Sequence, residues 1–409
     1  MIRKWFKSIG PGPLIAAAFI GPGTVTLCTL AGVGFGYALL WAMVLSVIAT
    51  VVLQEMAARL GIVTRKNLAE VIRTEIKQPA FQKLALILIV SAIIIGNAAY
   101  EAGNISGGVL GLETIFGRYA LDIGFTSLNY FSIAIGIVAF ILLYIGNYKV
   151  LQNALVTLVI VMSIAFLASA ILTKPNIAEI LKGAFVPKFP EGSLITILGL
   201  IGTTVVPYNL FLHSALAKEK WKDVSGLRVA KRDTLIAVVL GGVVSMCIII
   251  SAAAITTNGT VESAADLAKA LEPLLGVNAK YVLSIGLFAA GITSAITAPL
   301  AAAYVASGCF GWKSDLKSKR FRLVWILILV LGVLSSSTNI KSIEIIKFAQ
   351  VANGILLPVI AGMLLWMMNR SSLLGTYKNS KLQNVIGFVI LLITIVLGVK
   401  GILKVFNLL

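Results

Sequence analysis

Residues 19–30 read FIGPGTVTLCTL and place helix-breaking residues inside an apolar segment. Pro22 lacks a backbone N–H and clashes with the preceding turn, while Gly21 and Gly23 tolerate unwound dihedral angles. Freed backbone groups within a bilayer are tolerated where they are buried in protein or line a cavity. The stretch therefore predicts a broken helix that offers backbone groups and the Thr24 hydroxyl as ligands. On this segment alone, a simple proline kink is the alternative.

A second interruption occurs in LIGTTVVPYNLFLHSALAKE, where Pro207 stands near the middle of another apolar segment. Two interrupted helices at matching positions of two five-helix halves indicate an inverted-repeat transporter with its site at the midplane. Each break exposes a helix C-terminus, which favours cations, and a helix N-terminus, which favours anions. Backbone carbonyls near Gly21 and Thr203 and the side chain of Tyr208 are therefore candidate ligands.

Four further polar residues lie in apolar segments. Glu101, in GNAAYEAGN, is an ionisable residue at membrane depth, which is energetically costly and is a functional candidate by default. His213 is the only histidine and follows Pro207 by six residues, about 9 Å along a helix, so we expect it to line the same cavity. Gln350 and Asn353 share one helix face. The structural alternatives are a helix-bridging carboxyl, a packed histidine and interhelical hydrogen bonds.

The composition sets the environment of these residues. Of 409 residues, 59% are hydrophobic and only 12% are charged, whereas soluble proteins average about 25% charged. An integral membrane protein is indicated. The net charge of +18 would suggest nucleic acid in a soluble protein, but here it lies in loops, so we expect no nucleic-acid partner. The three cysteines are far apart in apolar segments and indicate neither a disulfide nor a metal site.

Hydropathy predicts an all-α protein with one transmembrane domain over residues 1–409. Two repeats of five helices cover about 11–173 and 193–368, and an extra helix covers about 383–406. The predicted spans are about 11–33, 36–60, 80–112, 126–146, 149–173, 193–217, 233–256, 279–308, 321–337, 343–368 and 383–406.

The loops after the second, sixth and eighth spans are rich in lysine and arginine, and they fall on one side of the membrane if there are eleven spans. The positive-inside rule then places the N-terminus in the cytoplasm and the C-terminus outside. Residues 65–77 form a candidate amphipathic helix at the cytoplasmic interface. We expect a bacterial cytoplasmic (inner) membrane protein.

The sequence resembles the NRAMP family of proton-coupled divalent metal transporters along nearly the whole chain. The similarity is carried by GPLIAAAFIGPGTVTLCTLAGVGFGYALLW, ARLGIVT, TTVVPYNLFLHSAL and AQVANGILLP. The resemblance implies a LeuT-like fold, shared with amino acid–polyamine–organocation transporters, in which helices 1 and 6 are broken at the midplane. It also implies a proton path through Glu101, a vestibule position for His213 and a substrate-facing Gln350.

The family's metal ligands are missing. Its Asp-Pro-Gly-Asn motif matches Gly-Pro-Gly-Thr at 21–24, and its Met-Pro-His motif matches Val-Pro-Tyr at 206–208. A dehydrated divalent cation needs anionic or strongly dipolar ligands, whereas a hydrated Mg²⁺ needs less from the protein. Neutral groups at a glycine-rich break also suit an anion at a helix N-terminus. A divalent cation of the Mn²⁺ or Mg²⁺ type and a small organic acid or amino-acid derivative both remain open as substrates.

We therefore expect a secondary transporter linked to protons or another ion. The predicted substrate-binding residues are Gly21, Gly23, Thr24, Thr203, Tyr208 and Gln350, the coupling residues are Glu101 and His213, and Pro22 and Pro207 break the helices. No metal ligand and no cofactor are assigned. No nucleotide-binding GxxxxGK[ST] loop is present, and no catalytic set can be assembled, so we expect no enzyme. A non-transporting receptor on this fold is disfavoured because it needs neither the breaks nor Glu101.

Overall fold

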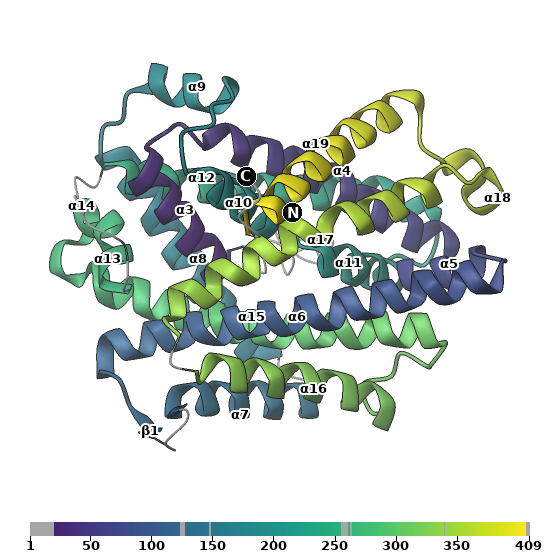
Figure 1. Cartoon of the computed structure of the whole chain (residues 1–409), viewed down its shortest axis with the longest axis horizontal. Coiled ribbons are helices and arrows are strands. Elements are labelled where there is room, and N and C mark those ends of the chain that lie inside the picture. Colours follow the sequence, from purple (N-terminus) through teal and green to yellow (C-terminus); the bar gives the residue numbers. More distant parts are fainter. Residues whose placement is uncertain are drawn as a thin grey trace, which may run out of the picture.

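The computed structural model describes residues 20–122, 127–146, 149–254, 261, 264–338 and 340–405. Helices dominate this part of the chain (Figure 1). Its hairpin pairs β1 (Ala120–Asp122) with β2 (Ser127–Asn129) in antiparallel register, with Leu121 opposite Leu128. The described part of the protein is therefore all-α apart from this short loop element.

Each of the eleven predicted spans corresponds to a helix or, for the sixth, a pair of helices. Most ends differ from the prediction by a few residues, and residues 11–19 of the first span lie outside the described residues. The observed helices are α3 (Pro22–Phe35), α4 (Leu40–Thr64), α6 (Pro79–Phe116), α7 (Tyr130–Ile145), α8 (Lys149–Leu172), α10 (Leu194–Thr204), α11 (Pro207–Lys220), α12 (Leu227–Ala253), α15 (Ala279–Phe310), α16 (Lys319–Ser336), α17 (Ser342–Met368) and α19 (Lys381–Val405).

Seven helical spans in the described part of the chain are long and apolar enough to cross a membrane, with α10 and α11 taken as one span. Part of α8 with α9 (Ile177–Phe185) makes an eighth if the two count together, although they bend by 119° where they meet. Helices α3 and α7 are also apolar but shorter, with 14 and 16 residues. The chain is a multi-pass helical membrane protein.

The remaining helical elements are short. They are α5 (Leu68–Glu75), α13 (Ala264–Ala268), α14 (Glu272–Leu275), α18 (Ser371–Leu374) and the 3₁₀ turns η1 (Val224–Gly226), η2 (Lys269–Leu271), η3 (Gly276–Asn278) and η4 (Gly375–Tyr377).

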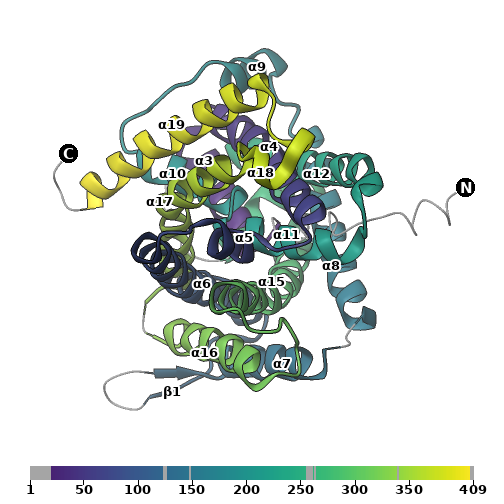
Figure 2. The same cartoon turned by 90° about the vertical axis from the view of Figure 1, so that its right-hand side faces the viewer.

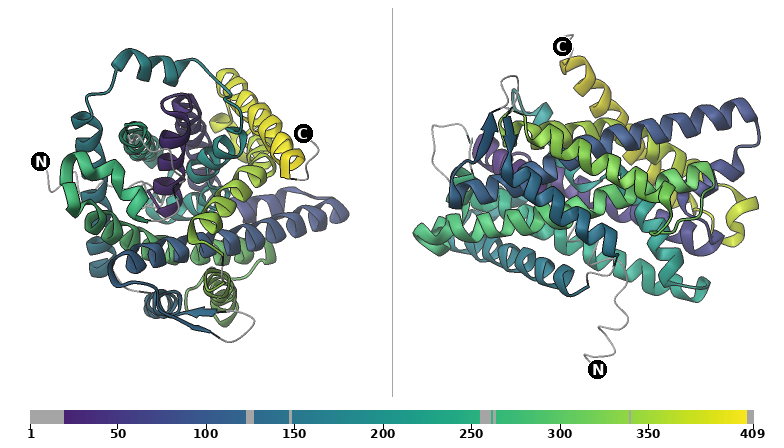
Figure 3. Two further views of the ribbon diagram at one scale, coloured as in Figure 1. Left: turned by 60° about the vertical axis from the view of Figure 1, so that its left-hand side comes forward. Right: turned by 90° about the horizontal axis from the view of Figure 1, so that it is seen from below.

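Small residues bring the central helices into close contact. A Cβ added to Gly291 of α15 would lie 2.8 Å from the Cα of Gly108 in α6, so these two helices touch backbone to backbone. In Figures 1 and 2, α7 and α16 lie on the opposite side of the α6–α15 pair from α3 and α10. Figure 3 shows α3 inside the bundle, and residues from Pro22 to Thr29 are buried. Small side chains are frequent in residues 291–308 of α15, which suits this close approach.

The basic loops meet at one end of the bundle. The Arg73 guanidinium donates to the carbonyl of Gly308 at 3.0 Å, which ties α5 to the end of α15. The ammonium of Lys218, near the end of α11, forms an ion pair with Glu70 of α5 at 3.0 Å. The predicted amphipathic helix is observed as α5, whose first turn is closed by a capping box between Asn67 and Glu70. The loops after the second, sixth and eighth spans therefore share a side, as predicted.

Candidate substrate site at two helix ends

The sixth span is broken where the sequence predicts. Helix α10 ends at Thr204, Val205 and Val206 are non-helical, and α11 restarts at Pro207. Proline brings no N–H, so the last turn of α10 loses a donor. Among the described residues, no hydrogen bond reaches the carbonyls of residues 202–204. This helix end therefore presents buried carbonyl oxygens together with the negative end of the helix dipole.

The first helix begins beside this break. Gly21 is extended, with φ −90° and ψ 177°, and caps α3 without any side-chain contact. Pro22 occupies the first helical position, where its missing N–H costs nothing. A helix begins at Pro22, while the half-helix expected before it lies outside the described residues, so the break in the first span stays a prediction.

The two helix ends are joined by side chains. The hydroxyl oxygens of Thr24 and Thr203 lie 2.9 Å apart in a hydrogen bond between the first turn of α3 and the last turn of α10. The amide of Gln350 in α17 lies directly over Gly23, because a Cβ on that glycine would come within 2.6 Å of the Gln350 side-chain carbonyl carbon. Gly202 of α10 packs as closely against the α17 backbone. The structure thus brings Gly23, Thr24, Thr203 and Gln350 together.

These groups are closed to solvent and only partly satisfied. The exposed fraction of Thr24, Thr203 and Gln350 is 2% or less. The amide oxygen of Gln350 is buried with no hydrogen-bond partner among the described residues. A buried amide oxygen without a donor is rare in a native protein and calls for an explanation such as a ligand or an ion.

Tyr208 points elsewhere. Its ring meets the edge of Tyr100 in α6 with 5.2 Å between centroids, and the side chain is fully buried. The next residue, Asn209, is fully buried, and neither atom of its amide finds a partner in the described part of the chain. Asn209 was not among the predicted binding residues. The signal was its position two residues after the helix-breaking Pro207.

Glu101 is fully buried on α6 and faces α16. A Cβ on Gly332 would lie 2.9 Å from the Cβ of Glu101, so the glycine makes room for this side chain. One carboxylate oxygen accepts a long hydrogen bond from the Asn104 amide at 3.4 Å. The other has no partner among the described residues. The contacts of Glu101 are therefore with α6 and α16, and not with the Thr24–Thr203 pair.

His213 is enclosed between two other helices. Its Nδ1 contacts the amide oxygen of Gln54 in α4, and its Nε2 lies 3.5 Å from the hydroxyl of Thr234 in α12. The side chain is fully buried. The sequence argument gave Gln54 no part in the site. The sequence feature that could have identified Gln54 is its polar amide within the apolar sequence of α4.

The side chains that meet at the site carry no formal charge. In the residues that the structure describes, no three His, Cys, Asp or Glu side chains come together as they would at a metal cluster. The group formed by Gly23, Thr24, Thr203 and Gln350 offers hydroxyl, amide and carbonyl oxygens and no carboxylate. Such a set suits hard, oxygen-preferring cations or a polar organic solute better than a soft metal.

Comparison with known proteins agrees with this architecture. The family model described as natural resistance-associated macrophage protein-like matches residues 12–404. The divalent metal cation transporter MntH of Bacillus subtilis (strain 168) is 29% identical over 99% of this chain and 94% of its own length.

The crystal structure of the Eremococcus coleocola manganese transporter with an aromatic bis-isothiourea substituted compound has a TM-score of 0.74. It is 24% identical and covers 97% of this chain and 86% of its own. MhsT in complex with L-phenylalanine has a TM-score of 0.60 at 16% identity, covering 96% of this chain and 98% of its own. These structures share the fold of the chain, that of the NRAMP and LeuT-like transporters.

Proposed function

Because the chain belongs to the natural resistance-associated macrophage protein-like family, we propose that it is a secondary transporter carrying a divalent metal cation across the membrane by alternating access. Curated relatives are described as divalent metal cation transporters. The observation that carries the proposal is the junction of α3, α10 and α17. Thr24, Thr203 and the Gln350 amide meet there at a helix end whose last carbonyls accept no hydrogen bond from the described residues.

The ligand set favours Mg²⁺ among divalent cations. The hydroxyls and amide oxygen are hard ligands, and Mg²⁺ usually keeps several of its waters when bound by a protein. Val206 stands where the family's methionine sulfur is expected, so the softer selection for transition metals is lost. The negative end of α10 supplies part of the missing charge. A partly hydrated cation held by dipoles is therefore the substrate that this neutral site suits best.

A proton-coupled symporter of a small organic acid or amino-acid derivative is the second candidate. Gly21 at the start of α3 carries no carboxylate to repel an anion, and α3 directs its N-terminal end into the same junction. MhsT, which has the same fold at 16% identity, was crystallised with L-phenylalanine. An anion at α3 with its amino or hydroxyl group at α10 would use both helix ends at once.

Transport requires the site to open alternately to each side. The repeats expected over 11–173 and 193–368 place the two broken helices against the rest of the bundle, and rocking between these parts exposes the site. Glu101 and His213, both buried ionisable groups, are the proposed coupling residues. The protein lies in a bacterial cytoplasmic membrane with its basic end and N-terminus inside and its C-terminus outside.

Uptake into proteoliposomes tests the transport proposal. Vesicles containing the protein are loaded with an Mg²⁺- or Mn²⁺-sensitive dye, and an inward proton gradient is applied. Saturable uptake above that of protein-free vesicles is expected, with Mg²⁺ preferred over Mn²⁺. Uptake that is equal in vesicles with and without the protein, for both ions, would reject the metal proposal.

Labelling tests the orientation. The native cysteines Cys28, Cys247 and Cys309 are buried, so they give a low background. Lys317→Cys, on the basic end, is expected to react with an impermeant maleimide only after cell lysis. Lys182→Cys, on α9, is expected to react in intact spheroplasts. The reverse pattern would invert the topology.

A further inference from the structure

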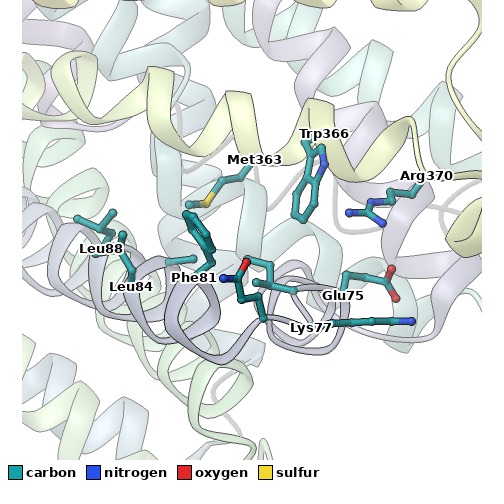
Figure 4. Close-up of a pocket in the computed structure, with 11 residues that line it drawn as sticks. Glu75, Lys77, Phe81, Leu84, Leu88, Met363, Trp366 and Arg370 are labelled. Atoms are coloured by element: carbon teal, nitrogen blue, oxygen red, sulfur yellow. The ribbon is translucent and has the colours of Figure 1, made fainter.

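A groove opens between α6 and α17 at the basic end of the bundle, separate from the helix junction described above. Its volume is about 580 Å³. The first turns of α6 form one wall and the last turns of α17 form the other (Figure 4). The side chains that line it are Glu75, Ile76, Lys77, Gln78, Phe81, Leu84, Ala85, Leu88, Met363, Trp366 and Arg370.

The side chains along the groove are apolar and exposed on the outside of the bundle. Phe81, Leu84 and Leu88 on α6 are 59%, 53% and 48% exposed, and Trp366 on α17 is 41% exposed. Residues 81 to 88 cover about 10 Å of helix. In a membrane protein, such an exposed apolar channel between two helices faces acyl chains.

One end of the groove is charged. Figure 4 shows Glu75, Lys77 and Arg370 gathered there, while Leu84 and Leu88 lie towards the other end. The Arg370 guanidinium lies 4.5 Å from the centroid of the Trp366 ring. In the described part of the chain neither Lys77 nor Arg370 pairs with a carboxylate. Two cations and one carboxylate leave this mouth with a net positive charge.

We propose that this groove binds an anionic phospholipid. One acyl chain lies along α6 between Phe81 and Leu88, and the phosphodiester sits between Lys77 and Arg370. Basic pockets between membrane helices recognise anionic head groups, and a tryptophan at the mouth suits the water–lipid boundary. The charge complementarity of the mouth and the apolar channel behind it select an amphipathic anion over a second protein copy. The proposal does not depend on the transported substrate.

Native mass spectrometry of the full-length protein tests this assignment. The protein is released from detergent with equal amounts of phosphatidylglycerol and phosphatidylcholine, and the retained lipid is measured for each. Preferential retention of phosphatidylglycerol is expected. Each basic residue near an anionic lipid contributes roughly fivefold in affinity, so Lys77→Ala with Arg370→Ala is expected to reduce the preference about 25-fold. Glu75→Gln is expected to raise it by roughly the same factor as one added charge.

Matched variants separate the groove from general surface charge. Lys182→Ala with Lys280→Ala removes two exposed lysines at the other end of the bundle and is expected to change nothing. Leu84→Trp fills the channel and is expected to reduce retention of both lipids, whereas Ile95→Trp, on an exposed position of α6 outside the groove, is expected to leave it unchanged. A separate arm with inorganic phosphate alone is expected to give no retained adduct.

Several results would overturn the assignment. They are equal retention of the two lipids, a preference unaffected by Lys77→Ala with Arg370→Ala, and binding of inorganic phosphate that matches binding of the lipid. A dimer that persists without lipid and dissociates on Leu84→Trp would assign the groove to a second copy of the chain.

Discussion

The side-chain oxygens of Thr24 and Thr203 lie 2.9 Å apart, although the two residues are 179 positions apart in the chain. This hydrogen bond joins the start of α3 to the end of α10 at the point where both helices leave backbone groups without helical partners. The pair therefore marks the place where α3 begins beside the break between α10 and α11. In the proposed transport cycle, a substrate held there would touch both helices.

Replacing Thr203 by valine keeps its shape and removes the hydroxyl. The hydrogen bond between Thr24 and Thr203 is then lost, and such a bond contributes about 0.5–1.5 kcal/mol. We expect kcat/KM for uptake to fall by roughly tenfold, with Thr203→Ser close to the unmodified protein. Equal uptake by the valine and serine variants would remove Thr203 from the site.

Any side chain at position 23 is expected to impair transport. A Cβ there would come within 2.6 Å of the Gln350 side chain, which is flexible and can move aside. Gly23→Ala should therefore fold, with its melting temperature little changed, but lose most uptake because Gln350 is displaced. Gly34→Ala is the matched control, because a Cβ at this position of the same helix meets nothing within 4 Å. Uptake that falls equally in both variants would show that only the helix backbone matters.

Glu101→Gln tests proton coupling. The amide has almost the same shape as the buried carboxyl, so the packing against Gly332 is retained, but it cannot carry a proton. We expect accumulation driven by a proton gradient to fall at least tenfold, while exchange of substrate at equal pH continues. Glu344→Gln, at an exposed carboxylate paired with Lys347, should leave both unchanged. Gradient-driven accumulation that survives in Glu101→Gln would assign this residue to packing alone.

Gln54→Leu tests the enclosure of His213. Removing the Gln54 amide leaves the buried Nδ1 of His213 without this partner, which costs about 1–3 kcal/mol of stability. A melting temperature several degrees lower is expected in detergent. Asn153→Leu, an amide-to-leucine change at an exposed helix position, provides the comparison and should have little effect. If the two variants have the same melting temperature, the Gln54–His213 contact makes no measurable contribution to stability.

Hydropathy and helix-breaking residues carried the prediction of the architecture. Runs of apolar residues located the long helices of the described residues, and Pro207 located the break between α10 and α11, because proline removes a backbone donor from a helix. The Thr24 and Thr203 positions followed from their proximity to these breaks.

Partners on distant helices could not be predicted in the same way. The contacts Gln54–His213 and Tyr100–Tyr208 depend on how each helix is rotated about its axis, and apolar residues on all sides of a membrane helix leave that rotation unspecified. The glycine that accommodates Glu101 lies on α16, more than 200 residues later. The docking of α9 was also absent from the prediction. A Cβ added to Gly183 of α9 would lie 2.9 Å from the carbonyl carbon of Tyr37, so the two backbones are in close contact.

The most direct test of the central claim compares uptake by the unmodified protein with that of Gly21→Asp combined with Val206→Met. Gly21 is extended, a backbone conformation that any residue adopts, so aspartate causes no backbone strain there. Val206 is fully buried, so retained melting temperature is checked first. If the neutral site carries a divalent cation, the unmodified protein will show saturable Mg²⁺ uptake, and the variant will gain Mn²⁺ uptake. No uptake of either ion by the unmodified protein, with Mn²⁺ transport appearing only in the variant, would contradict the metal assignment and favour the organic acid.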